Sequence, residues 1–101
     1  MTAALVLARS YGVAVRFAEL GDWGDAELRS EYDPSVPEIR LNLAVASRLT
    51  ETQLGEFVAL AVGHELYHHR EAMQEVPRLR DRHARESAAD AFAAGLLELP
   101  E

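Results

Sequence analysis

The chain of 101 residues contains no cysteine, and its ten basic residues are all arginines. Without cysteine there is no disulfide framework, no thiolate nucleophile and no sulfur-ligated metal. Any metal site must therefore use histidine and carboxylate ligands. The absence of cysteine also matches an intracellular protein, and we expect a cytoplasmic one.

Positive charge is scarce, because the formal net charge is −7 at pH 7. Phosphate contacts need clustered Arg or Lys, so we expect no direct binding of nucleic acid. Half of the arginines lie between residues 70 and 85. We interpret them as a solvated face interleaved with acidic residues, with a docking surface for an acidic partner as the alternative. They are Arg70, Arg78, Arg80, Arg82 and Arg85.

Long apolar runs are also missing. The N-terminal "TAALVLA" is too short to span a bilayer and has no basic region before it, so we expect neither a signal peptide nor a membrane partner. The composition, 49% hydrophobic and 27% charged, is typical of one globular core. We therefore expect one domain over residues 1–101.

The residue pattern predicts an α+β fold, with an N-terminal helix, a small three-stranded sheet and two long helices. Residues 2–11 have helical spacing before a glycine, and residues 13–20 alternate as a half-buried strand does. Residues 26–33 and 37–43 are the two further strands. Because the loops are short, we expect an antiparallel sheet, with Pro34 and Pro37 at a turn or an edge.

Both long helices have recognisable ends. The first runs from "LTETQLGEF" to Arg70, with Thr50 as its cap and Gln53 completing a capping box. The second is predicted from about Pro77, a residue type favoured at the first helical position, to about Leu97.

The first long helix carries "AVGHELYHHRE", in which His64, Glu65 and His68 follow the order H-E-x-x-H. Two histidines four residues apart share a helical face at about 6 Å and can bind one tetrahedral zinc. Glu65 is then placed to take a proton from water that attacks a carbonyl. The spacing alone is suggestive only, because random order would give it in roughly 2% of shuffled chains. A histidine that simply packs in the helix is the ordinary alternative.

A catalytic zinc needs a third protein ligand, and the next helix offers one. In "RESAADAFAAGLLELP", Glu86 and Asp90 lie four residues apart beside an apolar stripe. We interpret Glu86 as the third ligand and Asp90 as the hydrogen-bond acceptor for the non-ligating nitrogen of a zinc histidine. The alternative is a solvent-facing acidic edge paired with Arg82 or Arg85.

Together the two motifs resemble the ImmA/IrrE family of gluzincin metallopeptidases. The resemblance rests on H-E-x-x-H followed, 18 residues after its last histidine, by E-x-x-A-D-x-F-A-A-x-L-L-x-x-P, and it covers most of the chain. It implies a zincin-like fold and one zinc ion bound by His64, His68 and Glu86. It also implies that Glu65 is the general base and that Asp90 stands behind a histidine.

Two positions depart from the family pattern. Asp90 stands where the family usually has Asn, although thermolysin-like gluzincins show this Glu-x-x-x-Asp pair, and Leu99 stands where Met is common. The chain stops after "LLELP" and has no helix-turn-helix segment, whereas bacterial and phage relatives often act on or beside a separate DNA-binding repressor. The resemblance thus implies a protein or peptide substrate, with such a repressor as one candidate.

Three hypotheses stay open. The first is a zinc-dependent endopeptidase that holds an extended substrate on an edge strand within residues 27–43. The second is a non-catalytic protein-interaction module that keeps zinc for stability or regulation, and the third is a metal-free helical domain. Zinc is the expected ion, although two histidines and a carboxylate also suit iron or manganese.

Two features of the sequence remain unassigned. Gly63 either lets a strand or the Glu86 helix approach closely or is a tolerated surface glycine. No residue is identified as the stabiliser of a tetrahedral oxyanion. The candidates, each more readily explained as structural, are His83, His69, Tyr67, Tyr11 and Tyr32.

Overall fold

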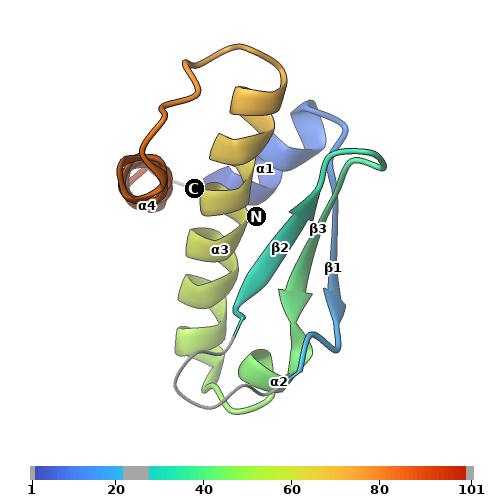
Figure 1. Ribbon diagram of the computed structural model, residues 1–101. Helices are drawn as coiled ribbons and strands as arrows, with labels where there is room; N and C mark the ends of the chain where they lie inside the picture. The colour runs from blue at the N-terminus through green and yellow to red at the C-terminus, as the bar shows by residue number, and fades with distance from the viewer. Residues whose placement is uncertain (1, 22–27, 100–101) are drawn as a thin grey trace.

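The computed structural model describes residues 2–21 and 28–99 and has the predicted α+β class (Figure 1). In chain order the elements are α1 (Ala3–Ser10), β1 (Ala14–Ala18), β2 (Ser30–Asp33), β3 (Glu38–Asn42), α2 (Leu43–Ala46), α3 (Glu51–Ala72) and α4 (Arg82–Leu97). Helices α1 and α3 lie against the sheet, and α4 packs on α3, which it crosses steeply.

The sheet is mixed, with the order β1-β3-β2. The expected antiparallel pairing holds for β2 and β3 but is wrong for β1, which runs parallel to β3. The expectation rested on short loops, which favour antiparallel pairing of strands that follow one another in sequence. Instead β3, whose Ile39 and Leu41 are fully buried, takes the central position, and the polar strand β2 lies at an edge. The expected strand of residues 26–33 begins at Ser30, and residues 26 and 27 lie outside the described part.

The outer face of the sheet is charged. Arg40 of β3 pairs with Glu31 at 2.6 Å and also with Glu38, and Arg16 of β1 pairs with Glu38 at 2.6 Å. These bonds, chiefly the one from Arg16, hold the pKa of the Glu38 carboxyl below its ordinary value. Because side chains alternate along a strand, Ile39 and Leu41 then face the helices.

The motif helix α3 begins where the sequence predicts. The Thr50 hydroxyl accepts a hydrogen bond from the Gln53 backbone N–H at 3.2 Å, and the Gln53 side chain accepts one from the Thr50 N–H at 3.0 Å. The capping box is therefore confirmed.

Helix α4 begins at Arg82, so the predicted start at Pro77 is wrong. The Asp81 carboxylate accepts hydrogen bonds from the backbone N–H groups of His83 and Ala84, at 3.3 and 3.2 Å. A proline restricts the backbone for helix entry but supplies no acceptor for these N–H groups, whereas Asp81 does.

A four-residue helix, α2, was not predicted. It follows β3 directly, because Asn42 ends the strand and its side-chain oxygen accepts a hydrogen bond from the Ala44 N–H at 3.0 Å. The predicted strand of residues 37–43 therefore ends one residue early. The two prolines lie in the turn between β2 and β3, as expected.

The core lies between the inner face of the sheet and the two helices that cover it. Val62 and Leu66 of α3 are fully buried beside Ile39 and Leu41, and α1 contributes small residues, among them Ala4. Among the described residues, no helix offers an apolar stretch long enough to cross a lipid bilayer. The arrangement makes α3 the central element, with the sheet and α4 on different sides of it (Figure 1).

Candidate metal centre

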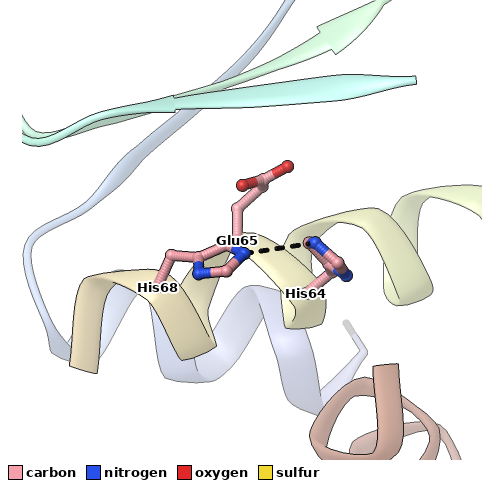
Figure 2. A group of neighbouring side chains, drawn as sticks. All are labelled: His64, Glu65 and His68. Atoms are coloured by element: carbon pink, nitrogen blue, oxygen red, sulfur yellow. Dashed lines mark hydrogen bonds between the residues drawn. The ribbon is translucent and has the colours of Figure 1, made fainter. Parts of the chain in front are cut away.

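His64 and His68 stand on successive turns of α3, and their imidazoles converge through Nε2. The two Nε2 atoms are 3.3 Å apart, and the dashed line in Figure 2 joins them. Zinc binds histidine nitrogen at about 2.0–2.1 Å in tetrahedral geometry, so two of its ligand atoms lie about 3.3 Å apart. The spacing of the two imidazoles thus fits one shared ion.

Helix α4 brings a carboxylate to the same point. Glu86 Oε2 is 2.7 Å from His64 Nε2, and Glu86 Oε1 is 3.5 Å from His68 Nε2. Two nitrogen lone pairs and a carboxylate directed at one another repel unless a proton or a cation lies between them. The donor set, two imidazoles and one carboxylate, therefore fits a divalent metal. The three residues predicted as ligands are close together, and their binding of an ion stays a prediction.

Each histidine is held from behind by a second carboxylate. His64 Nδ1 is 2.7 Å from Asp90 Oδ1, and His68 Nδ1 is 2.7 Å from Glu71 Oε1. A carboxylate accepts a hydrogen bond, so an imidazole whose Nε2 binds a cation at the shared point can donate its Nδ1–H to the carboxylate at that nitrogen. The prediction named Asp90 for this position and missed Glu71. The signal for Glu71 is its i, i+3 spacing from His68, in the last letter of "AVGHELYHHRE".

Glu71 is the most deeply enclosed of these acids, with a side chain that is only 3% exposed. Arg85 donates to both of its oxygens, at 3.1 Å to Oε1 and 3.2 Å to Oε2. Burial raises the pKa of the Glu71 carboxyl, but the hydrogen bonds from Arg85 and His68 outweigh it and hold the pKa below its ordinary value. Arg85, weighed from the sequence as a partner of Glu86 or Asp90, makes its ion pair here instead.

Glu65 lies between the two histidines in sequence but points toward the edge strand β2 (Figure 2). The Ser30 hydroxyl donates a 2.6 Å hydrogen bond to Glu65 Oε2, and Glu65 is 7% exposed. Ligand atoms of His64, Glu65 and His68 lie within 4.8 Å of one another, so the carboxylate borders the point where the imidazoles meet. Ser30 was not identified from the sequence, where no motif marks it.

Gly63 explains how α4 can pack so closely against α3. A Cβ at this position would stand 2.8 Å from Ala93 Cα and 2.9 Å from Ala93 Cβ. The expectation of close packing against the Glu86 helix is confirmed, and the surface-glycine alternative is wrong. The approach of α4 to α3 depends on the missing side chain.

The group opens onto a cleft of about 1010 Å³. His64, Glu65, His68 and Glu86 line one part of it. The remainder includes the N-terminal half of α3 and has a mixed lining, in which Leu28 and Leu49 lie among polar residues such as Arg29 and Glu56. The apolar lining from α3 itself comprises Phe57, Leu60 and Ala61. A cleft of this volume is large enough for several residues of a peptide.

The residues considered for the oxyanion have other contacts. The buried His69 shares a 2.7 Å hydrogen bond with the Tyr32 hydroxyl, and Tyr11 donates to Glu75 at 2.6 Å. Tyr67 packs against Phe92, and His83 is exposed at the start of α4. None of the five candidates is among the described residues that line the cleft. The structure therefore supports their structural interpretation.

No family model matches the chain, and neither the curated proteins nor the solved structures contain a significant match. Support for a functional site therefore comes from the structure itself, in which a His-Glu-His group on a long helix could hold a metal ion.

Proposed function

We propose that this protein is a zinc-dependent endopeptidase. The single observation that carries the proposal is the convergence of His64 Nε2, His68 Nε2 and the Glu86 carboxylate beside a large cleft that Glu65 also lines. Their resemblance in sequence to the ImmA/IrrE gluzincins supports the same activity. A zinc ion held by these groups would polarise a substrate carbonyl and acidify water.

The roles of the chain's own residues follow from their positions. Glu65 accepts a proton from the water whose oxygen attacks the carbonyl carbon, and it returns that proton to the amide nitrogen as the C–N bond breaks. The Ser30 hydroxyl holds Glu65 Oε2, so the other carboxylate oxygen is the proton acceptor. Asp90 keeps the hydrogen of His64 on Nδ1.

The substrate of this proposal is an extended segment of a protein. Strand β2 lies at an edge of the sheet, and its first residue, Ser30, lines the cleft. An extended peptide can pair with such an edge while its side chains enter the cleft. The apolar wall formed with Phe57 and Leu60 favours a bulky apolar side chain near the cleaved bond. A DNA-binding repressor is the substrate class that the family resemblance suggests.

Replacement of the proposed base tests the activity directly. Glu65→Gln should lower the hydrolysis of a quenched fluorescent peptide library by roughly 10²–10⁴-fold while the bound zinc is retained. Glu51→Gln is the matched control, since Glu51 also lies on α3, is exposed and is not among the described residues that line the cleft. Full proteolysis by folded Glu65→Gln would show that the proposed mechanism is wrong.

Elemental analysis tests the metal independently of any substrate. Wild-type protein purified without added metal should carry near-stoichiometric zinc, and Glu86→Ala should lose it. Glu98→Ala, which replaces an exposed acid just beyond α4, should keep it. Metal-free wild-type protein would remove the basis for a metallopeptidase.

A non-catalytic zinc-stabilised interaction module is the second candidate. The observation that favours it is the hydrogen bond between Glu65 and Ser30, which ties the proposed base to the sheet. In such a module Glu65→Gln keeps the binding of a partner, whereas His68→Ala abolishes folding and binding together. A pull-down with the two variants, once a partner is known, separates the two functions.

A further inference from the structure

Glu71 occupies an unusual position for a carboxylate, because it is almost fully buried and joins two helices. Its Oε1 is 2.7 Å from His68 Nδ1, and Arg85 of α4 donates to both of its oxygens. Arg85 directly precedes Glu86 in the sequence. One carboxylate thus contacts a proposed ligand on α3 and the residue next to the proposed ligand on α4.

We propose that Glu71 is a positioning residue that sets the ring orientation and tautomer of His68 and, through Arg85, fixes the start of α4 so that Glu86 reaches the same point. The inference rests on the proposed metal centre and adds a residue that the H-E-x-x-H and E-x-x-A-D motifs do not contain. Its contribution is distinct from that of Asp90, which holds His64 from an exposed position on α4.

The chemistry of the contact supports this role. An imidazole whose Nδ1–H is held by a carboxylate presents Nε2 in a fixed direction and as a better donor to a metal. A buried carboxylate needs compensation, and the paired guanidinium supplies it. The pair also explains how a long helix that buries few residues keeps its first turn next to α3.

The test uses purified full-length protein and zinc alone as the probe. The zinc dissociation constant, measured by competition with a chromophoric chelator, should rise about 10–100-fold in Glu71→Ala. Glu71→Gln retains an oxygen that accepts the His68 Nδ1–H but loses the charge that pairs with Arg85, so it should recover part of the lost affinity. Glu75→Ala is the matched control, since Glu75 pairs with Arg70 and Tyr11 and does not contact the histidines.

A second readout does not depend on metal or on the folding of a variant. Nitrogen-15 spectra of the imidazoles of zinc-free wild type report which ring nitrogen of His68 carries the hydrogen. The inference requires the hydrogen of His68 on Nδ1. A hydrogen on Nε2 would overturn it.

The outcomes separate this inference from the proposed function. Zinc binding by wild type with an equal affinity in folded Glu71→Ala overturns the role of Glu71 and leaves the metallopeptidase proposal standing. Wild type that binds no zinc overturns both. A weakened Glu71→Ala, a partly restored Glu71→Gln and an unchanged Glu75→Ala support the inference.

Discussion

The two long helices contribute to the same site but are built differently. Helix α3 buries nine residues between Phe57 and Glu71, among them Val62 and Leu66, and it contacts both the sheet and α1. Helix α4 buries only Ala89 and Ala93 among its described residues. One helix is part of the core, and the other is docked on it through small side chains and ion pairs.

This difference divides the candidate site. The histidines, Glu65 and Glu71 belong to the core helix, whereas Glu86 and Asp90 arrive on the docked one. The exposure of the two acids behind the histidines shows the contrast, since the Glu71 side chain is 3% exposed and that of Asp90 is 75% exposed. The residues of α3 are therefore held in place by the core, whereas the positions of Glu86 and Asp90 depend on how firmly α4 is held.

The largest difference in stability between the helices should appear when one leucine of each helix is replaced by alanine. Leu66 of α3 is fully buried and Leu97 of α4 is 43% exposed. Leu66→Ala should lower the free energy of unfolding by about 2–5 kcal/mol, because it removes buried methyl groups and leaves a cavity. Leu97→Ala should change it by no more than about 0.5 kcal/mol. Urea denaturation measures both, and equal losses would contradict the division into core and docked helices.

The core helix is also the part that sequence reasoning predicts well. The capping box at Thr50 and the H-E-x-x-H spacing are local patterns, and both histidines lie where the helical period places them. The start of α4 was predicted wrongly because proline fits several positions near a helix, whereas the side chain of Asp81 supplies the acceptors that the first N–H groups need. The direction of β1 was predicted wrongly because β1 pairs with β3 rather than with β2. The central position goes to the strand that buries the most apolar surface, and no local pattern encodes which strand that is.

Removal of metal should loosen the docked helix more than the core helix. With free zinc at 100 times its dissociation constant, binding stabilises the folded state by about 2.7 kcal/mol, so a chelator should lower the melting temperature. Glu86 links α4 to the histidines. Amide hydrogen exchange in chelator should therefore accelerate in α4 while the amides around Val62 stay protected. Equal acceleration in both helices would contradict a docked α4, and an unchanged melting temperature would contradict a bound metal.

Adding a side chain where the two helices touch should have the next largest effect on stability. Gly63→Ala places a methyl group against the Ala93 backbone, so α4 must move, at a cost of about 1–3 kcal/mol in the free energy of unfolding. Gly55→Ala on the same helix meets nothing within 4 Å and should instead stabilise by about 0.5–1 kcal/mol. Thermal denaturation compares them. Stabilisation by both substitutions would show that α4 adjusts freely at this contact.

Only those site residues that stand in a known motif could be predicted from the sequence. His64, His68, Glu86 and Asp90 stand in two motifs, and the structure brings all four together. The i, i+3 spacing of Glu71 from His68 is a local signal, but many exposed acids share such a spacing with a histidine. What distinguishes Glu71 is its contact with Arg85 across two helices, and a sequence contains no distance between them. Its role depends on burial, which only the packing of α3 reveals.

The smallest predicted effect concerns the caps that begin the two helices. Asp81→Ala and Thr50→Ala each remove a side-chain acceptor from exposed N–H groups, so each should lower the free energy of unfolding by about 1 kcal/mol. Their effects on zinc affinity should differ. Asp81 caps the turn of α4 that carries Arg85 and directly precedes Glu86, whereas the histidines lie several turns beyond Thr50. Asp81→Ala should therefore weaken zinc affinity, Asp81→Asn should retain it because Asn also caps, and Thr50→Ala should leave it unchanged. Equal zinc affinities in folded Asp81→Ala and Thr50→Ala would mean that the ion itself, rather than the start of α4, determines where Glu86 lies.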